Sequence, residues 1–153
     1  MPEVVSLGWH LTHGNFASFH EWGVPVPWGW TAFTTEDTLV VQRMHRFGFR
    51  SGAFSQVMVV PQGFPPNYKF EPEQWQKITI ENQLKHGFRF VSSSRIRLDG
   101  KDGFCFAFAA LQDAQRRRIT CDFPDLNLSV GFIGDQSYAS TLDSIIKHIT
   151  KGN

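Results

Sequence analysis

The last thirty residues, 124–153, constrain the fold more than any other part of the chain. From Leu126 to Phe132, large apolar residues alternate with small or polar ones, which is the two-residue period of a strand with one buried face. Gly134 and Asp135 then predict the end of this strand and the cap of a helix. The helix carries one apolar stripe at i, i+4, i+7, i+8 and i+11, formed by Tyr138, Leu142, Ile145, Ile146 and Ile149. A sheet that contains the preceding strand can supply the apolar surface that this stripe needs.

The middle of the chain predicts strands on both sides of one long helix. The runs Thr38 to Arg46 and Phe54 to Val60 are rich in β-formers and are expected to pair through a turn at 48–52. Pro72 at a first helical position predicts a helix that ends near Lys85 before Gly87. Its buried side is expected to contain Trp75 and Ile78, followed by Ile80 and Leu84.

Residues 88–132 read as a four-stranded meander, with hairpin chemistry at 99–103. Strand runs that are separated by one helix and followed by another predict an antiparallel sheet covered by helices. Earlier in the chain, Val24 to Trp30 contains two prolines and is expected to form an edge strand or a strand entry. Residues 1–20 are expected to form an irregular aromatic arm that leads into a short strand near Phe16. The sequence therefore predicts a single α+β domain over 1–153.

Composition limits the classes of function. Among the 153 residues, 41% are hydrophobic and 19% are charged, and this balance is typical of a globular protein. The net charge of +1 gives no general electrostatic reason to expect nucleic acid or a membrane surface as partner. No apolar run approaches the length of a transmembrane helix, and no signal peptide is visible at Met1 to Ser6. The localisation stays open between a cytoplasmic protein, the default, and an exported one whose leader has been removed.

The order of the elements and three local features resemble the PsbP-like and DcrB-like superfamily of small α/β/α sandwich proteins. The features are Val26-Pro27-Trp28-Gly29-Trp30, the mid-chain helix before a meander, and an extended run to Phe132 followed by a helix that closes in LDSIIKHI (Leu142 to Ile149). The resemblance implies a twisted, mainly antiparallel sheet covered by two helices. Members of this superfamily are mostly non-catalytic assembly factors, exported lipoproteins, small-GTPase binders and chaperones. The resemblance therefore implies a protein that binds another macromolecule, without indicating which residues do so.

Aromatic residues are the first candidates for a binding site. Large rings bury much area with little loss of entropy, so an exposed cluster favours a protein partner. The alternative is that these rings close one end of the core. The residues concerned are Trp22, Trp28, Trp30, Phe64 and Tyr68.

Arginines form a second candidate surface. Three are predicted to project from one face of a strand and three to follow in a neighbouring turn, and together they could bind an acidic partner. The alternative is an ordinary solvated face, because exposed strand positions are commonly charged. The six residues are Arg89, Arg95, Arg97, Arg116, Arg117 and Arg118.

Histidines and cysteines complete the candidates. His10, His13 and His20 could supply nitrogen ligands for a metal ion, or could be scattered polar residues of the arm. Cys105 and Cys121 are expected to lie opposite each other on adjacent strands, either as a disulfide or as two buried thiols.

No catalytic sequence motif is present in the chain. There is no Walker loop, GxGxxG, GxSxG or HExxH, so an enzyme is not favoured and no cofactor is expected. The leading hypothesis is a non-enzymatic binding or assembly protein that recognises a protein partner through an aromatic or sheet-edge surface. The competing hypothesis is a metal-binding or small-ligand-binding protein that uses the three histidines. The sequence leaves the oligomeric state open.

Overall fold

The computed structural model describes residues 2–44, 54–65 and 68–152. These residues form an α+β fold with antiparallel sheets, as the sequence predicts. The helices are α1 (Pro2–His13), α2 (Pro72–Lys85) and α3 (Ser140–His148), with short 3-10 turns η1 (Pro124–Leu126) and η2 (Gln136–Tyr138).

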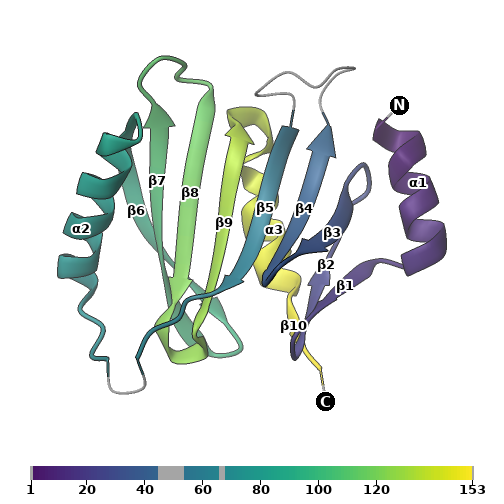
Figure 1. Cartoon of the computed structure of the whole chain (residues 1–153), viewed down its shortest axis with the longest axis horizontal. Helices are drawn as coiled ribbons and strands as arrows, with labels where there is room; N and C mark the ends of the chain where they lie inside the picture. The colour runs from purple at the N-terminus through teal and green to yellow at the C-terminus, as the bar shows by residue number, and fades with distance from the viewer. Residues whose placement is uncertain (1, 45–53, 66–67, 153) are drawn as a thin grey trace.

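A seven-stranded antiparallel sheet forms the centre of the molecule (Figure 1). Its strand order, β3-β4-β5-β9-β8-β7-β6, joins an N-terminal meander to the predicted four-stranded meander through the β5–β9 pair. The predicted pairing of β4 with β5 is confirmed, whereas the turn expected at 48–52 lies outside the described residues. The strands are β3 (Thr31–Thr35), β4 (Thr38–Met44), β5 (Phe54–Pro61), β6 (Phe88–Leu98), β7 (Lys101–Ala110), β8 (Arg116–Phe123) and β9 (Leu128–Asp135).

A smaller sheet of three strands lies beside the main one, with β2 between β1 and β10. The sequence predicts an edge strand or a strand entry at Val24 to Trp30; β2 is the middle strand of this sheet, but its residues Val24 and Pro25 pair only with β1. Pro25 is tolerated because it is the last residue of β2 and pairs only with Phe16 of β1, while β10 pairs with Trp22 and Gly23. The three strands are β1 (Phe16–Phe19), β2 (Trp22–Pro25) and β10 (Thr150–Lys151).

Each face of the large sheet packs against a different helix. On one face, Leu142, Ile145 and Ile146 of α3 are almost completely buried in a cluster that includes Cys105 and Val130. On the other face, Phe106 and Phe108 pack against Trp75 and Ile80 of α2. Successive residues of β7 point to opposite faces, so a single strand supplies both cores.

The predicted C-terminal strand and helix are both present, with changed bounds. The helix, predicted over 137–149, is α3 at Ser140–His148, and Tyr138 lies in the preceding 3-10 turn η2. The strand β9 begins at Leu128 rather than at Leu126, because Pro124–Leu126 forms η1 and Asn127 adopts a left-handed conformation with φ 50°. The side chain of Asp135 accepts a hydrogen bond from the Ser137 amide and so caps the turn that leads into α3.

Helix α2 has the predicted bounds but not the predicted orientation. Ile78 and Leu84, expected on its buried side, are 48% and 56% exposed, whereas Gln83 is buried. The helix turns Trp75, Thr79 and Gln83 toward the sheet, so a partly polar side makes the contact.

The N-terminal segment corrects the prediction of an irregular arm. Residues 2–13 form α1, and the expected short strand near Phe16 is β1. Gly8 and the β-branched residues Val4, Val5 and Thr12 weaken the helical signal in the sequence. The helix is stabilised by contacts with distant residues, which local sequence patterns do not reveal.

Candidate functional site

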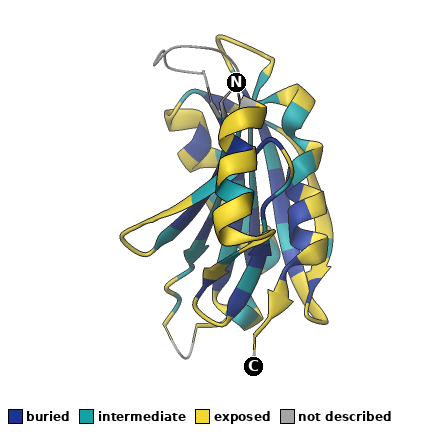
Figure 2. Cartoon of the chain, turned by 90° about the vertical axis from the view of Figure 1, so that its right-hand side faces the viewer, coloured by how far each residue is buried: buried dark blue, intermediate teal, exposed yellow. Residues whose placement is uncertain are grey.

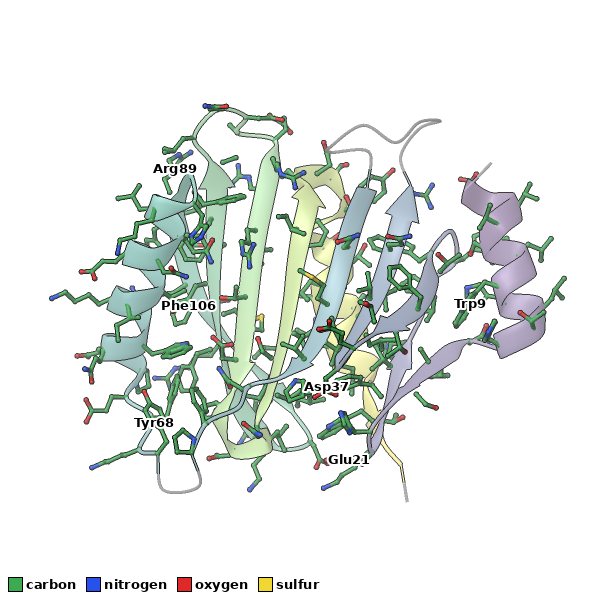
Figure 3. The ribbon with its side chains drawn as sticks, viewed as in Figure 1. Trp9, Glu21, Asp37, Tyr68, Arg89 and Phe106 are labelled. Atoms are coloured by element: carbon green, nitrogen blue, oxygen red, sulfur yellow. A yellow bond between two sulfur atoms is a disulfide. The ribbon has the colours of Figure 1, made fainter. Side chains whose placement is uncertain are left out.

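One side of α1 is hydrogen-bonded to the segment that leads into the edge strand β3. The buried hydroxyl of Ser6 donates to the carbonyl oxygen of Trp30 at 2.8 Å and accepts from the amide of Gly29 at 2.9 Å. The indole Nε1 of Trp9 donates to the carbonyl oxygen of Ala32 at 3.0 Å, and its side chain projects from α1 toward the strands (Figure 3). These bonds satisfy backbone groups at the β3 edge and fix the side of the helix that faces the sheet.

An ion pair holds the first turn of α1 in the same orientation. Arg43 on β4 donates from Nη2 to Oε1 of Glu3 at 2.9 Å, and its guanidinium lies 5.4 Å from the ring centre of Tyr138. Hydrogen bonds from its own backbone amide and from Arg43 lower the pKa of Glu3. The guanidinium also lies against Gly29, which has φ +90°, so that a side chain at this position would collide with it.

The opposite side of α1 presents large apolar side chains to solvent. Val4, Leu7 and Leu11 recur at i, i+3 and i+7 and therefore form one stripe along the helix, here called the α1 stripe. Their exposed fractions are 62%, 44% and 78%. In Figure 2, α1 lies nearest the viewer, and most of its surface is coloured as exposed. The part of the chain that the structure describes places no side chain over this stripe that buries it.

Trp28 extends the apolar surface beside the α1 stripe. Its side chain is 60% exposed, and its ring centre lies 5.8 Å from that of His10. His10 lies one helical turn after Leu7, and its Nε2 is 3.3 Å from the carbonyl oxygen of Pro27. The α1 stripe and Trp28 together are the candidate site, and Trp28 is its only member that the sequence singles out.

The other predicted aromatic residues do not join this surface. Trp22 and Trp30 are buried in the main core. Phe64 and Tyr68 stack with ring centres 4.7 Å apart, and Phe64 also contacts Trp75 of α2. Tyr68 therefore lies on the α2 side of the molecule, at the opposite end from Trp9 (Figure 3). The structure does not form one groove from the five predicted rings.

The three histidines do not converge on a metal site. His10 faces carbonyl oxygens of Gly14 and Pro27, and the Nδ1 of His13 lies 3.0 Å from the carbonyl oxygen of Trp9. His20 lies in the β1–β2 turn, where its Nε2 is 2.8 Å from Oδ1 of Asp37. No group of three or more His, Cys, Asp or Glu side chains that could hold a metal ion occurs among the described residues. The described residues therefore give no support to the competing hypothesis of a histidine metal centre.

The six arginines do not form one basic face. A β-bulge between Phe90 and Ser92 shifts the register of β6, so Arg89 lies on the α3 face while Arg95 and Arg97 lie on the α2 face. The predicted arginine turn is in fact the start of β8, and alternation separates Arg117 from its neighbours on each side, Arg116 and Arg118. Burial is the main cause that lowers the pKa of Arg118, with Arg116 nearby as a smaller one.

The two cysteines lie directly opposite each other on β7 and β8, in the predicted register. Their sulfur atoms are joined in a disulfide, with an S–S distance of 2.09 Å and a Cα–Cα distance of 4.1 Å. Both residues are buried in the core beneath α3. The bond links two strands of the central sheet and takes no part in the α1 surface.

Comparisons with known proteins identify the fold. No protein-family model matches the sequence, and no curated protein sequence matches it either. Among solved structures, the chain is similar to the solution structure of cyanobacterial PsbP (CyanoP) from Synechocystis sp. PCC 6803, with a TM-score of 0.57, 9% sequence identity and 86% of each chain covered. The chain has a PsbP-like fold. The DcrB-like part of the resemblance is not confirmed, and the PsbP-like fold by itself carries no residue of CyanoP over to this chain.

No helix in the described part of the chain is both long and apolar enough to cross a membrane.

Helix α1 was not predicted, although the sequence holds one signal for it: the spacing of Val4, Leu7 and Leu11 next to the polar residues Ser6 and His10. This spacing predicts a helix with an apolar side, although it does not predict that the apolar side faces away from the fold.

Proposed function

We propose that this protein is a non-enzymatic binding or assembly protein, and that a protein partner docks on the α1 stripe and Trp28. The observation that carries the proposal is the orientation of α1. Ser6, Trp9 and Glu3 are hydrogen-bonded to the fold, while Val4, Leu7 and Leu11 point away from it. Contiguous exposed apolar side chains on a fixed element are typical of interaction sites. The similarity to CyanoP supports the fold of this chain and does not indicate which residues bind a partner.

The chemistry of α1 favours a protein over a membrane as the occupant. Helices that lie on anionic membranes carry Lys and Arg on their polar side, and α1 contains neither residue. Apolar side chains at i, i+3 and i+7 are instead the pattern by which one helix is bound in an apolar groove of a partner. We therefore expect the partner to present such a groove, with a pocket for Leu11 and an aromatic-lined or aliphatic site for Trp28.

The sheet edges support a partner less well. Hydrogen bonds from Ser6 and Trp9 already occupy carbonyl groups at and just before the β3 edge. The other edge strand, β6, carries a bulge and the exposed Arg95 and Arg97. Bulges and charged residues protect a sheet edge from pairing with another strand. The α1 surface is therefore preferred to strand addition.

Site-specific photo-crosslinking tests the proposal with a matched control. A benzophenone amino acid is placed at Leu11, and in a second protein at Leu84, which is an exposed leucine on α2. We expect one protein to crosslink at Leu11 in cells of the source organism and not at Leu84. The purified partner is then titrated calorimetrically with Leu11→Asp and Leu84→Asp variants. Because a central apolar contact contributes more than ~1.4 kcal/mol, Leu11→Asp should weaken binding by about tenfold or more and Leu84→Asp by less than about twofold.

Three results would overturn the proposal. The first is partner binding that is equally strong for the Leu11→Asp and wild-type proteins. The second is a dimer of the wild-type chain that Leu11→Asp dissociates in light scattering, because the surface would then belong to a second copy. The third is co-sedimentation of the wild-type protein with lipid vesicles that Leu11→Asp abolishes.

A further inference from the structure

Helix α2 lies at the opposite end of the molecule from α1 (Figure 1). A cleft with both polar and apolar lining residues lies between α2 and the large sheet. Its volume is about 410 Å³, which is within the range of small-molecule sites in proteins. Trp75 and Gln83 of α2 form one wall, and Thr120 and Asp122 of β8 with Ser129 of β9 form the other. The cleft is separate from the α1 surface and does not depend on the proposed function.

The orientation of α2 makes this cleft unusual. The helix leaves Ile78 and Leu84 about half exposed, with Ile78 at the cleft, while Thr79 and Gln83 line the cleft beside the sheet. Helices on a sheet ordinarily cover it with their apolar side. Beside the apolar contact that Trp75 and Ile80 make with the sheet, α2 therefore also turns polar side chains toward it, which indicates a site that can bind a polar group.

Two buried polar atoms in the cleft have no partner within the described chain. Gln83 is only 7% exposed, and its Oε1 accepts no hydrogen bond. The hydroxyl of Thr120, across the cleft on β8, also lacks a hydrogen-bond partner. Buried polar groups in proteins are almost always hydrogen-bonded, so these two atoms indicate where a ligand makes its contacts.

Asp122 provides the charge of the cleft. Asp122 is 5% exposed, and its carboxylate accepts hydrogen bonds from Trp75 Nε1 at 2.8 Å and from Ser129 Oγ at 2.9 Å. Burial raises the pKa of Asp122, and these two hydrogen bonds oppose that effect. Both donors are neutral, and no described cationic side chain forms an ion pair with this carboxylate. Glu81 and Lys85 of α2 also line the cleft and are exposed.

We propose that this cleft binds a small organic cation through Asp122 and Gln83. The carboxylate of Asp122 and the Oε1 of Gln83 are both acceptors, so they fit an ammonium or amidinium group that carries several N–H donors. The Thr120 hydroxyl accepts a further donor or donates to a polar atom of the ligand. The indole of Trp75, held in place by its bond to Asp122, supplies an aromatic surface beside the cation.

A charge series of similar shape tests the proposal on the full-length chain. Benzamidine is the cationic probe, benzamide its neutral counterpart and benzoate its anionic one, and 1,4-diaminobutane serves as a flexible second cation. Binding is followed by calorimetry and by shifts of the Trp75 Nε1–H signal in NMR spectra. We expect at least one of the two cations to bind and to shift this signal. Benzamide and benzoate should bind at least about tenfold more weakly than that cation.

Variants locate the site and separate it from general surface binding. Asp122→Asn keeps an acceptor for Trp75 but removes the charge, and should weaken cation binding by about tenfold or more. Gln83→Leu has a similar volume without the acceptor and should weaken it by about threefold or more. Asp125→Asn, which removes an exposed carboxylate three residues further along the chain, should have no effect.

Some outcomes would refute a cation site. These are the absence of binding by both cations, equal binding of benzamide and benzamidine, or equal effects of Asp122→Asn and Asp125→Asn. Should Asp122→Asn fail to fold, the Gln83→Leu variant and the charge series decide the matter by themselves.

Discussion

Helices α1 and α3 carry similar apolar stripes with opposite burial. In α3, Leu142, Ile145 and Ile146 are at most 1% exposed and lie on the sheet. In α1, the corresponding stripe is exposed, and the helix is attached through Ser6 and Trp9 on its other side. An apolar stripe therefore shows that a helix has a surface to bury, without showing whether the same chain or a partner covers it.

The attachments of the two helices differ in chemistry as well. Helix α3 is held by apolar contacts, which are strong in sum and need no exact geometry. Helix α1 is held by directed hydrogen bonds and by the Glu3–Arg43 pair, which fix its rotation about its own axis. A helix fixed in this way presents the same side to solvent at all times, and so it suits a docking surface.

Alanine substitutions on the two stripes give the largest expected contrast. Ile146→Ala removes a fully buried side chain under α3, and should lower the free energy of unfolding by ~2–5 kcal/mol because it leaves a cavity. Leu11→Ala removes an exposed side chain and should change it by less than ~0.5 kcal/mol. Urea unfolding followed by circular dichroism measures both. A cost for Leu11→Ala as large as that for Ile146→Ala would mean that the fold itself covers the α1 stripe.

The disulfide provides a second test on the α3 side of the comparison. Cys105 and Cys121 lie in the core that α3 covers, with a sequence separation of 16. Reduction, or the Cys105→Ala/Cys121→Ala double variant, should lower the free energy of unfolding by ~3 kcal/mol, because a cross-link of this loop length restricts the unfolded chain. The Leu11→Asp variant should show the same loss on reduction as the wild type. Alkylation of freshly lysed cells, followed by mass measurement, shows whether the disulfide is already present in the cell: free thiols at Cys105 and Cys121 would gain the alkyl mass, and a disulfide would not.

The attachment of α1 is tested by Ser6→Ala. This change leaves the Gly29 amide and the Trp30 carbonyl without their partner, and should weaken the docking of α1 by ~1–2 kcal/mol. Hydrogen exchange should then become faster in α1 and not in α3, since the helix opens locally. Thr12→Ala, which removes an exposed hydroxyl on the same helix, is the matched control. Equal exchange in the two variants would show that Ser6 is not an anchor.

Helix α2, which neither stripe involves, gives the smallest expected effect: a change of the unfolding free energy with pH. The pKa of Asp122 is raised by burial against α2, so the folded state binds its proton at pH values where the unfolded state has released it. The contribution of this group to stability is therefore present at low pH and is lost as the pH rises above about 4, the usual range of a carboxyl group. The Asp122→Asn variant lacks this loss.

The stability of Asp122→Asn relative to the wild type should accordingly increase between pH 4 and pH 7, measured by urea unfolding at several pH values. Asp125→Asn is the control and should show a constant difference. Both variants keep Glu81 and Lys85, the charged residues of α2 that line the cleft. If the difference in unfolding free energy between Asp122→Asn and the wild type stays constant with pH, the raised pKa of Asp122 is contradicted.

The sequence predicts the elements of this fold better than their surroundings. The alternation in β9, the α3 stripe and Pro72 at the start of α2 are local signals, and the structure has each of these elements. The rotation of α2, which exposes Ile78 and buries Gln83, depends on the opposite wall of the cleft. No local pattern contains that information.

The candidate site was less predictable for two physical reasons. Helix α1 is stabilised by Ser6 and Trp9, whose carbonyl partners, Trp30 and Ala32, are 24 and 23 residues away along the chain. The proposed arginine face is divided by a bulge at Val91, where one extra residue reverses the side that each later side chain faces. Trp28 could be selected because it is an aromatic residue in a Pro-rich segment, but its neighbours on α1 could not.

Thiol labelling under native conditions measures the central claim most directly, because both native cysteines are joined in the disulfide and an introduced cysteine is then the only free thiol. Leu11→Cys and Ile146→Cys are treated with a chromogenic disulfide reagent, before and after unfolding in urea. The account predicts that Cys at position 11 reacts in the folded protein about as fast as in the unfolded one, while Cys at position 146 reacts only after unfolding. Protection of position 11 in the isolated, folded monomer would contradict it.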